Sequence, residues 1–194
     1  MDWAVKDAFS LDAWTALPAL ATATKTARLG TYVLCNQFRH PSELARMVST
    51  LDFVSGGRVD LGLGAGWLKK EFTMFGLDWA PLQKRLERLR ESIKIIKALS
   101  TGNKVSFSGK YCSLQEANLE PKPVQRPHSP IFVGGVIKKV KDIAAELGDG
   151  WIPEGLPAEE FSDGVEYIKN KAKEFGRDPN KIFAAWEEAT SKTS

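Results

Sequence analysis

The sequence predicts an α/β fold built on a parallel sheet, and three observations lead to this prediction. Strand-like and helix-like segments alternate along the 194 residues, with about five strands and a helix after nearly every one. Glycines follow the strand-like segments at 58–63 and 131–133. The composition, 43% hydrophobic and 26% charged, is that of a globular protein with a sizeable core. A doubly wound open sheet and part of a barrel both fit, and both place ligands at the carboxyl ends of the strands.

The first half of the chain is expected to alternate regularly. Ser10 is a candidate cap for a helix with apolar residues at helical spacing, although Pro18 lies inside it. Glycines at 56–57 end a second helix that begins near Pro41, because glycine adopts the left-handed cap conformation at little cost. A longer helix ends near Gly102. The expected strands are 28–35 and 58–64, and the expected helices are 11–20, 41–55 and 82–101.

The second half begins with an irregular excursion. Residues 103–130 are expected to form a small hairpin and an extended, proline-rich connector, in which His128 is exposed. We expect the whole chain, 1–194, to be one domain. The remaining expected strands are 130–135, 149–153 and 181–189, and the remaining helices are 138–148 and 157–176.

Charge and composition exclude several classes of function. The net charge of +3 is spread over mixed signs, which argues against a nucleic-acid or membrane-surface partner. No apolar run is long enough to span a membrane, and the first residues do not read as a secretion leader, so a cytoplasmic protein is expected. Two cysteines are too few for a disulfide framework, and no cysteine or histidine cluster indicates a metal site.

The segment RVDLGLGAGW, residues 58–67, raises the question of what Gly62, Gly64 and Gly66 make room for. A dinucleotide-binding loop needs G-x-G-x-x-G and an acidic residue about 20 residues later, and a Walker loop needs Gly-Lys-Ser/Thr. Neither pattern is present. The segment is similar to the first motif of Rossmann methyltransferases, but the long helix and the excursion that follow do not fit that fold. Glycines that merely let the strand and a helix pack closely are the alternative to a ligand.

A second glycine pair ends the strand-like segment IFVGG and is followed by a helix. Free backbone N–H groups at such a position bind anions, and the helix dipole favours the negative charge. Lys138 and Lys139, in the first helical turn, would suit a bound phosphate; ordinary solvated lysines are the alternative.

Five stretches carry a family resemblance: ARLGTYVL, FRHPSELARMVSTLDFVSGGRVDLGLGAGW, RLERLRESIKIIKAL, PKPVQRPHSPIFVGG and AAELGDGW. In this order, and over most of the chain, they resemble the bacterial-luciferase-like family of flavin- and deazaflavin-dependent oxidoreductases. The resemblance implies a (β/α)8 TIM barrel, present here as an incomplete barrel with about strands 3 to 7. It also implies an oxidoreductase acting on a small organic substrate, either by hydride transfer with coenzyme F420 or as an FMN-dependent monooxygenase.

The resemblance further implies where the cofactor ring lies. A non-proline cis peptide is expected around Tyr32–Val33, and Val33, Cys35 and Asn36 would line the ring face. Val33 as plain core and Cys35 as a small buried hydrophobe are the alternatives.

The loop after the next strand would border the ring and the substrate. Because Gly64 and Gly66 have no side chains, they would leave room for the ring and the substrate above the strand end. Lys70 occupies a position where the family often has a polar residue that faces the cofactor. Trp67 stands where some deazaflavin enzymes of the family carry an acid, so it would border an apolar substrate pocket or pack in the core. No catalytic residue is assigned.

The cofactor phosphate would bind the backbone N–H groups of Gly134, Gly135 and Val136, with Gly150 and Trp151 nearby. Many relatives have serine at the position of Val136, and valine removes that hydroxyl.

Three charged residues recur in the family pattern. Glu71, Arg85 and Arg88 would form an ion-pair network that fixes the loop, or else a solvated face.

About five strands cannot close an eight-stranded barrel. We therefore expect a homo-oligomer, or completion by further chain segments, and an isolated chain that associates or is poorly stable. The alternative function is a catalytically inert barrel remnant or partner subunit that binds a phosphate-bearing cofactor.

Overall fold

A parallel sheet forms the centre of the protein in a computed structural model that describes residues 11–185. Its strands lie in the order β1/β2, β3, β6, β7 and β8, where β1 and β2 are two halves of one interrupted strand beside β3. The fold is therefore α/β with neighbouring strands of a barrel, as the sequence predicts. The strands are β1 (Leu29–Gly30), β2 (Leu34–Cys35), β3 (Val59–Gly64), β6 (Ile131–Gly134), β7 (Gly150–Ile152) and β8 (Phe183–Ala184).

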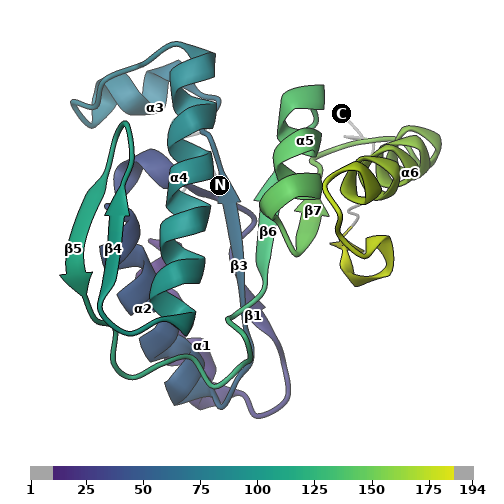
Figure 1. The fold of residues 1–194 in the computed structure, drawn as a ribbon. Helices are drawn as coiled ribbons and strands as arrows, with labels where there is room; N and C mark the ends of the chain where they lie inside the picture. The colour runs from purple at the N-terminus through teal and green to yellow at the C-terminus, as the bar shows by residue number, and fades with distance from the viewer. Residues whose placement is uncertain (1–10, 186–194) are drawn as a thin grey trace.

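Five helices form a row in which each packs against the next, in the same order as the strands (Figure 1). They are α1 (Ala13–Ala23), α2 (Pro41–Ser55), α4 (Leu82–Thr101), α5 (Lys138–Leu147) and α6 (Ala158–Glu174), and the short α3 (Lys69–Met74) follows β3. Strand residues that face the row, such as Leu61, Leu63 and Val133, are fully buried. Alternate residues of a strand face opposite sides, so Gly62 and Gly64 lie on the other face, which becomes the inside of a closed barrel.

The structure changes two expected elements and describes only part of a third. Asp12 caps α1, with its carboxylate accepting the Thr15 N–H at 2.9 Å, and Ser10 lies outside the described residues. The strand expected at 28–35 is interrupted between β1 and β2, because the chain leaves the sheet there. Of the strand expected at 181–189, the described residues contain only β8.

The expected hairpin and connector are present. The strands β4 (Val105–Ser108) and β5 (Ser113–Ala117) pair antiparallel and lie beside α4 (Figure 1). The connector that follows returns the chain to the start of β6 and contains cis peptide bonds at Glu120–Pro121 and Arg126–Pro127. No helix in the described part of the chain has the length and apolar character needed to cross a membrane.

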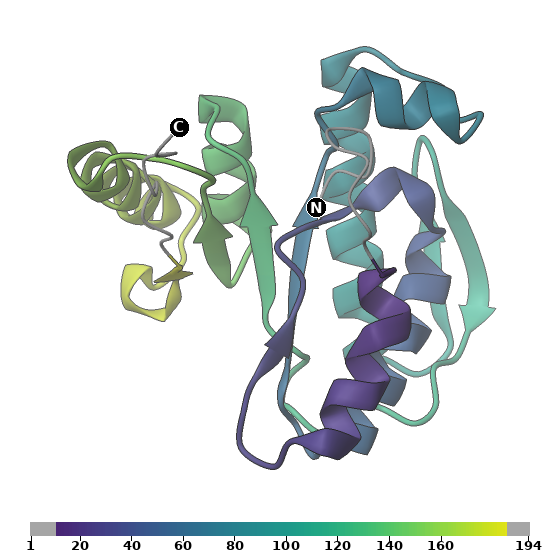
Figure 2. The ribbon, with the colours of Figure 1, turned by 180° about the vertical axis from the view of Figure 1, so that it is seen from behind.

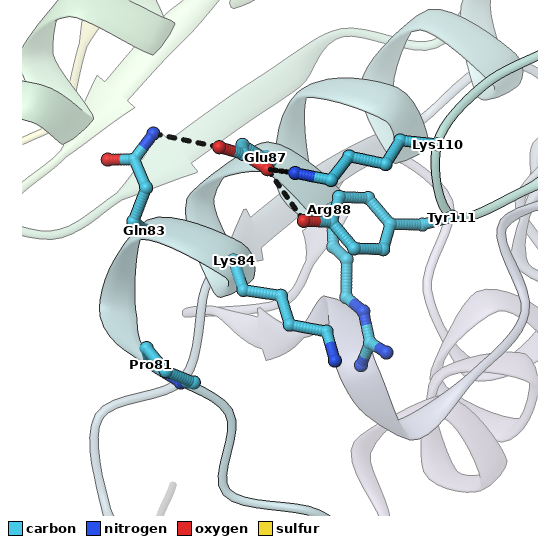
Figure 3. Close-up of a pocket in the computed structure, with 7 residues that line it drawn as sticks. All are labelled: Pro81, Gln83, Lys84, Glu87, Arg88, Lys110 and Tyr111. Carbon is cyan, nitrogen blue, oxygen red and sulfur yellow. Dashed lines mark hydrogen bonds and ion pairs between the residues drawn. The ribbon is translucent and has the colours of Figure 1, made fainter.

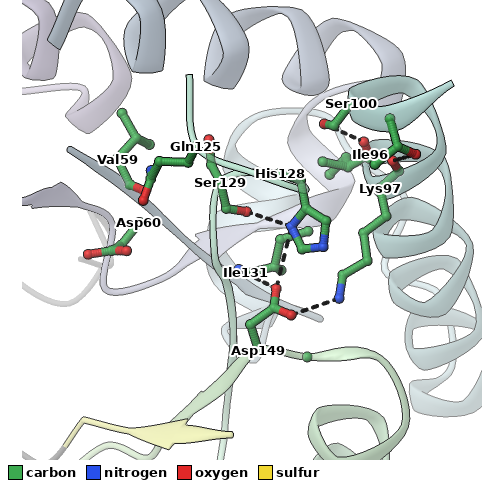
Figure 4. A network of polar contacts seen from close by, with 12 residues as sticks. Val59, Asp60, Ile96, Lys97, Ser100, Gln125, His128, Ser129, Ile131 and Asp149 are labelled. Atoms are coloured by element: carbon green, nitrogen blue, oxygen red, sulfur yellow. Dashed lines mark hydrogen bonds and ion pairs between the residues drawn. The ribbon is translucent and has the colours of Figure 1, made fainter. Parts of the chain in front are cut away.

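A polar network fastens the amino ends of β6 and β7 (Figure 4). The Asp149 carboxylate accepts the Ile131 N–H at 2.9 Å and Lys97 Nζ at 3.0 Å, and His128 Nδ1 lies 3.6 Å from it. Burial lowers the pKa of Lys97. The His128 side chain is only 10% exposed, so the expectation that it is exposed is wrong: the connector brings it against Asp149.

Three basic side chains cap helices at the ends that lead toward the strands. Arg58 donates to two carbonyls at the end of α1 (2.7 and 3.1 Å). Lys122 donates to two at the end of α4 (3.0 and 2.6 Å), and Arg177 to three at the end of α5 (2.6 to 3.3 Å). Each places a positive charge against carbonyls at the carboxyl end of a helix, which is the negative end of its dipole.

Candidate cofactor site at the carboxyl ends of the strands

The carboxyl ends of four neighbouring strands form one row across the sheet. The register pairs Cys35 with Gly64, Gly64 with Gly134, and Gly134 with Ile152. The loops that follow these residues therefore emerge along a single edge, which we call the rim. In barrels of this type ligands bind at this edge.

Between β1 and β2 the chain bulges out of the sheet. The Tyr32–Val33 peptide bond in this bulge is cis, which confirms the expectation from the family resemblance. The Thr31 hydroxyl donates to the Gly62 carbonyl at 2.8 Å, and β2 then rejoins β3. Figure 2 shows this edge of the sheet from behind, where the chain runs from α1 along the edge strand to the start of α2. The bulge places Val33 against the sheet face opposite the helix row.

Three glycines make room for the bulge. A Cβ at Gly62 would lie 1.8 Å from the Thr31 carbonyl oxygen, and a Cβ at Gly64 or Gly134 would lie 2.9 or 2.5 Å from Val33 Cγ2. Any side chain at these positions would displace the bulge, so we call Gly62, Gly64 and Gly134 the glycine floor. Gly62 and Gly64 therefore make room for a neighbouring strand segment, and the alternative that they let the strand pack against a helix is wrong for these two residues. Val33, which stays partly exposed, is the side chain that a ligand above the floor would meet.

Arg85 holds the loop after β3. Gly66 in this loop has a φ of 77°, and a Cβ there would lie 2.7 Å from Cys35 Sγ. Arg85 is 6% exposed and donates to the carbonyls of Gly66 and Ala80, the latter at 3.1 Å. Its guanidinium lies 3.8 Å from the centroid of the Trp79 ring, and burial lowers its pKa. Arg85 is therefore a buried anchor of the loop.

The other two charged residues of the expected network differ from each other. Glu71 is 7% exposed, so a solvated face is wrong for Glu71 as it is for Arg85. Arg88 is partly exposed and donates to Gln37 Oε1 at 3.1 Å. An ion-pair network among the three stays a prediction.

Asn36 and Cys35 support the rim. Asn36 is 5% exposed, and with its amide oriented to satisfy both atoms it donates to the Gly64 carbonyl at 3.0 Å and accepts the Leu89 N–H at 3.3 Å. Cys35 is partly buried, with its thiol against Gly66. Both predicted residues thus lie at the rim, and Asn36 ties it to α4.

Three predicted site residues lie on open surface beyond the rim, two in loops and one in α3. The Trp67 side chain is 60% exposed, so Trp67 is not a core residue. Val136 is 42% exposed, and Lys70 is exposed in the first turn of α3. All three are accessible to a ligand.

The loop after β6 is fixed by contacts with β7. The Gly135 N–H donates to the Ile152 carbonyl at 3.1 Å, and the buried Trp151 indole donates to the Gly135 carbonyl at 2.8 Å. The Gly135 N–H is therefore not available to an anion, and Trp151 positions the loop from within the core. Gly150 pairs with Phe132, two residues before the rim.

The N–H groups that remain for an anion come after the glycine pair. Within residues 11–185, the N–H groups of Val136 and Ile137 bind no acceptor, and α5 has no side-chain cap. Lys138 Nζ lies 5.6 Å from the Tyr167 ring centroid, and Lys139 donates to Gln83 Oε1 at 3.2 Å. These contacts favour the surface alternative for both lysines.

Tyr32 is a residue of the site that sequence reasoning missed. Its hydroxyl donates to the Pro153 carbonyl at 2.6 Å and so joins the bulge to the loop after β7, although β3 and β6 lie between them in the sheet. The side chain is 43% exposed. The expected cis bond at Tyr32–Val33 was the one sequence feature that could have pointed to Tyr32.

This rim geometry coincides with a family match. The model of the luciferase-like monooxygenase family matches residues 2–185. The chain belongs to the luciferase-like monooxygenase family.

Similar proteins of the luciferase-like type use two cofactors. An F420-dependent glucose-6-phosphate dehydrogenase of Amycolatopsis mediterranei (strain U-32) is 39% identical over 72% of this chain and 41% of its own length. An FMNH(2)-dependent dimethylsulfone monooxygenase of Pseudomonas putida is 32% identical over 79% of this chain and 42% of its own length.

The luciferase-like fold is also seen in solved structures. An F420-dependent secondary alcohol dehydrogenase, in complex with an F420-acetone adduct, superposes with a TM-score of 0.85 at 27% identity. The match covers 94% of this chain and 55% of that one. This chain spans about half the length of the luciferase-like proteins that it matches.

Proposed function

We propose that this chain is part of an oxidoreductase that binds coenzyme F420 or FMN at the rim and acts on a small organic substrate. The observation that carries the proposal is the bulge over the glycine floor, which presents Val33 beside the row of strand ends. The relatives that depend on F420 and on FMNH(2) support both cofactors. When bound, the cofactor would supply the redox chemistry: hydride transfer with F420, or oxygenation with reduced FMN.

The residues of this chain would bind the cofactor and orient it toward the substrate. Val33 offers an apolar surface, which suits a flat ring. The N–H groups of Val136 and Ile137 suit a phosphate, because they lie just before a helix N-terminus and have no other acceptor in the described residues. Trp67, exposed in the loop after β3, would form an apolar border for the substrate.

A second copy of the chain, or further chain segments, would complete the barrel. The two edge strands of the described sheet, β1/β2 and β8, have no neighbour on one side. Size-exclusion chromatography with light scattering tests this part of the proposal. A monodisperse monomer that unfolds cooperatively above about 60 °C would contradict it. A cytoplasmic location stays a prediction.

Titration with FMN, riboflavin and F420, each followed by ligand fluorescence, tests the proposed site. We expect saturable binding of FMN or F420. If the amides of Val136 and Ile137 hold the phosphate, FMN should bind about tenfold or more tightly than riboflavin, because riboflavin lacks the phosphate. Equal affinity for FMN and riboflavin would contradict the phosphate assignment.

The outcomes of these titrations and of turnover assays also distinguish an oxidoreductase from a catalytically inert partner subunit. Binding of the reduced cofactor followed by its oxidation in the presence of a substrate panel supports an oxidoreductase. Binding without turnover of any substrate favours the inert partner subunit. A folded sample that binds neither cofactor defeats both.

A further inference from the structure

A groove separates the amino-terminal half of α4 from the tip of the β4–β5 hairpin (Figure 3). Its volume is about 710 Å³, and it lies on the side of α4 that faces the hairpin, whereas Leu86 and Leu89 of the same helix are buried in the core. None of the residues that line it is among those predicted to hold the cofactor. Its lining residues are Pro81, Gln83, Lys84, Glu87, Arg88, Lys110 and Tyr111.

The carboxylate in this groove is fully engaged. Glu87 accepts Lys110 Nζ at 2.9 Å, the Tyr111 hydroxyl at 2.6 Å and Gln83 Nε2 at 3.0 Å. The charges of Glu87 and Lys110 therefore cancel, and Glu87 has little capacity left to neutralise another cation.

Two cations of the groove remain without a counter-ion. Within residues 11–185, Lys84 has no hydrogen bond or ion pair, and Arg88 donates only to the neutral Gln37 amide. Lys84 and Arg88 are one helical turn apart on α4, and both line the groove (Figure 3). Like charges at this spacing repel each other, and an anion shared between them would remove that cost.

Arg88 is also oriented for such a contact. Its guanidinium lies 5.3 Å from the centroid of the Tyr111 ring and is tethered at one end to Gln37. A guanidinium held in this way presents its remaining N–H groups as a fork, which matches the two oxygens of a phosphate or a carboxylate.

We propose that this groove is a binding site for a small-molecule anion with a phosphate or carboxylate group, held between Lys84 and Arg88 beside Tyr111. The site does not depend on the proposed function, because none of its lining residues belongs to the rim.

Titration of the full chain with inorganic phosphate and, separately, with succinate tests the site at low ionic strength. Amide chemical shifts of residues 84–88 and 109–112 report on the groove, and the two probes distinguish a phosphate from a carboxylate. We expect saturable shifts with at least one probe. Lys84→Gln should weaken that binding about tenfold, and Lys84→Arg, which keeps the charge, should restore most of it.

The matched control is Lys94→Gln, which removes the same charge from an exposed position of α4 outside the groove. It should change the affinity by about twofold or less, because only the general field of the protein changes. Shifts that do not saturate with either probe, or equal losses in Lys84→Gln and Lys94→Gln, would overturn the proposal. Lys84 has no hydrogen bond or ion pair among the described residues, so we expect its substitution to leave the fold intact.

Discussion

Val33 lies so close to Gly134 that a Cβ on the glycine would stand 2.5 Å from Val33 Cγ2. Side chains do not approach each other this closely. The bulge and the glycine floor therefore depend on each other, although they come from separate strands. This relationship gives the first testable prediction.

Gly134→Ala should lower the free energy of unfolding by about 1–3 kcal/mol, because the new methyl group overpacks the bulge. Urea denaturation measures this change. Val33→Ala in the same chain should recover a large part of the loss, since it removes the two methyl groups that the new Cβ meets. If the effects of the two substitutions simply add, the proposed contact is absent.

Arg85→Met should lower the free energy of unfolding by about 2–3 kcal/mol, because the carbonyls of Gly66 and Ala80 lose their donor and Trp79 loses its cation. Hydrogen exchange should accelerate in the loop at 65–67. Lys94→Met, on the exposed side of the same helix, is the control and should change stability by about 0.5 kcal/mol or less. Equal effects of the two substitutions would show that Arg85 does not hold the loop.

Asp149→Ala should destabilise the protein by about 2 kcal/mol, because Lys97 and the Ile131 N–H lose their acceptor in a partly buried site. Asp149→Asn keeps an acceptor oxygen and should cost less. Both variants should bind FMN or F420 with the affinity of the parent chain, because Asp149 lies at the amino end of the sheet. A folded Asp149→Asn variant that loses cofactor binding would contradict this separation.

The stability of the protein should fall in acid partly through Glu87. Hydrogen bonds from Lys110, Tyr111 and Gln83 lower its pKa from 4.5 to about 2. The folded state thus favours the carboxylate, so this stabilisation is fully present above pH 4.5 and is lost as the pH falls toward 2. Urea midpoints of the parent chain and Glu87→Gln should converge across this window. Curves that stay parallel through it would rule out this contribution.

The sequence predicts those features that depend on local pattern. Alternating strands and helices, the glycines at strand ends and the left-handed cap at Gly56 are local, and the structure contains them. The cis bond at Tyr32–Val33 followed from the resemblance, because nothing in the local sequence demands it.

Features that depend on distant partners could not be predicted. The glycine floor faces Thr31 and Val33 of another strand. The spacing of the glycines alone therefore could not distinguish a ligand site from close packing. His128 is covered by Asp149, which follows it by a whole strand and helix. The cap of α1 is a local exception: Ser10 was the expected cap, and Asp12, also a good capping residue, forms the hydrogen bond to Thr15.

The helix caps of Arg58, Lys122 and Arg177, together with the network around Asp149, lie where the helices lead toward the strands. Exposed residues beyond the opposite edge, such as Trp67 and Val136, contribute little to this fastening. Mutations there can accumulate at small thermodynamic cost while the scaffold persists. Relatives as different as a sugar-phosphate dehydrogenase and a sulfone monooxygenase are consistent with such drift on one framework.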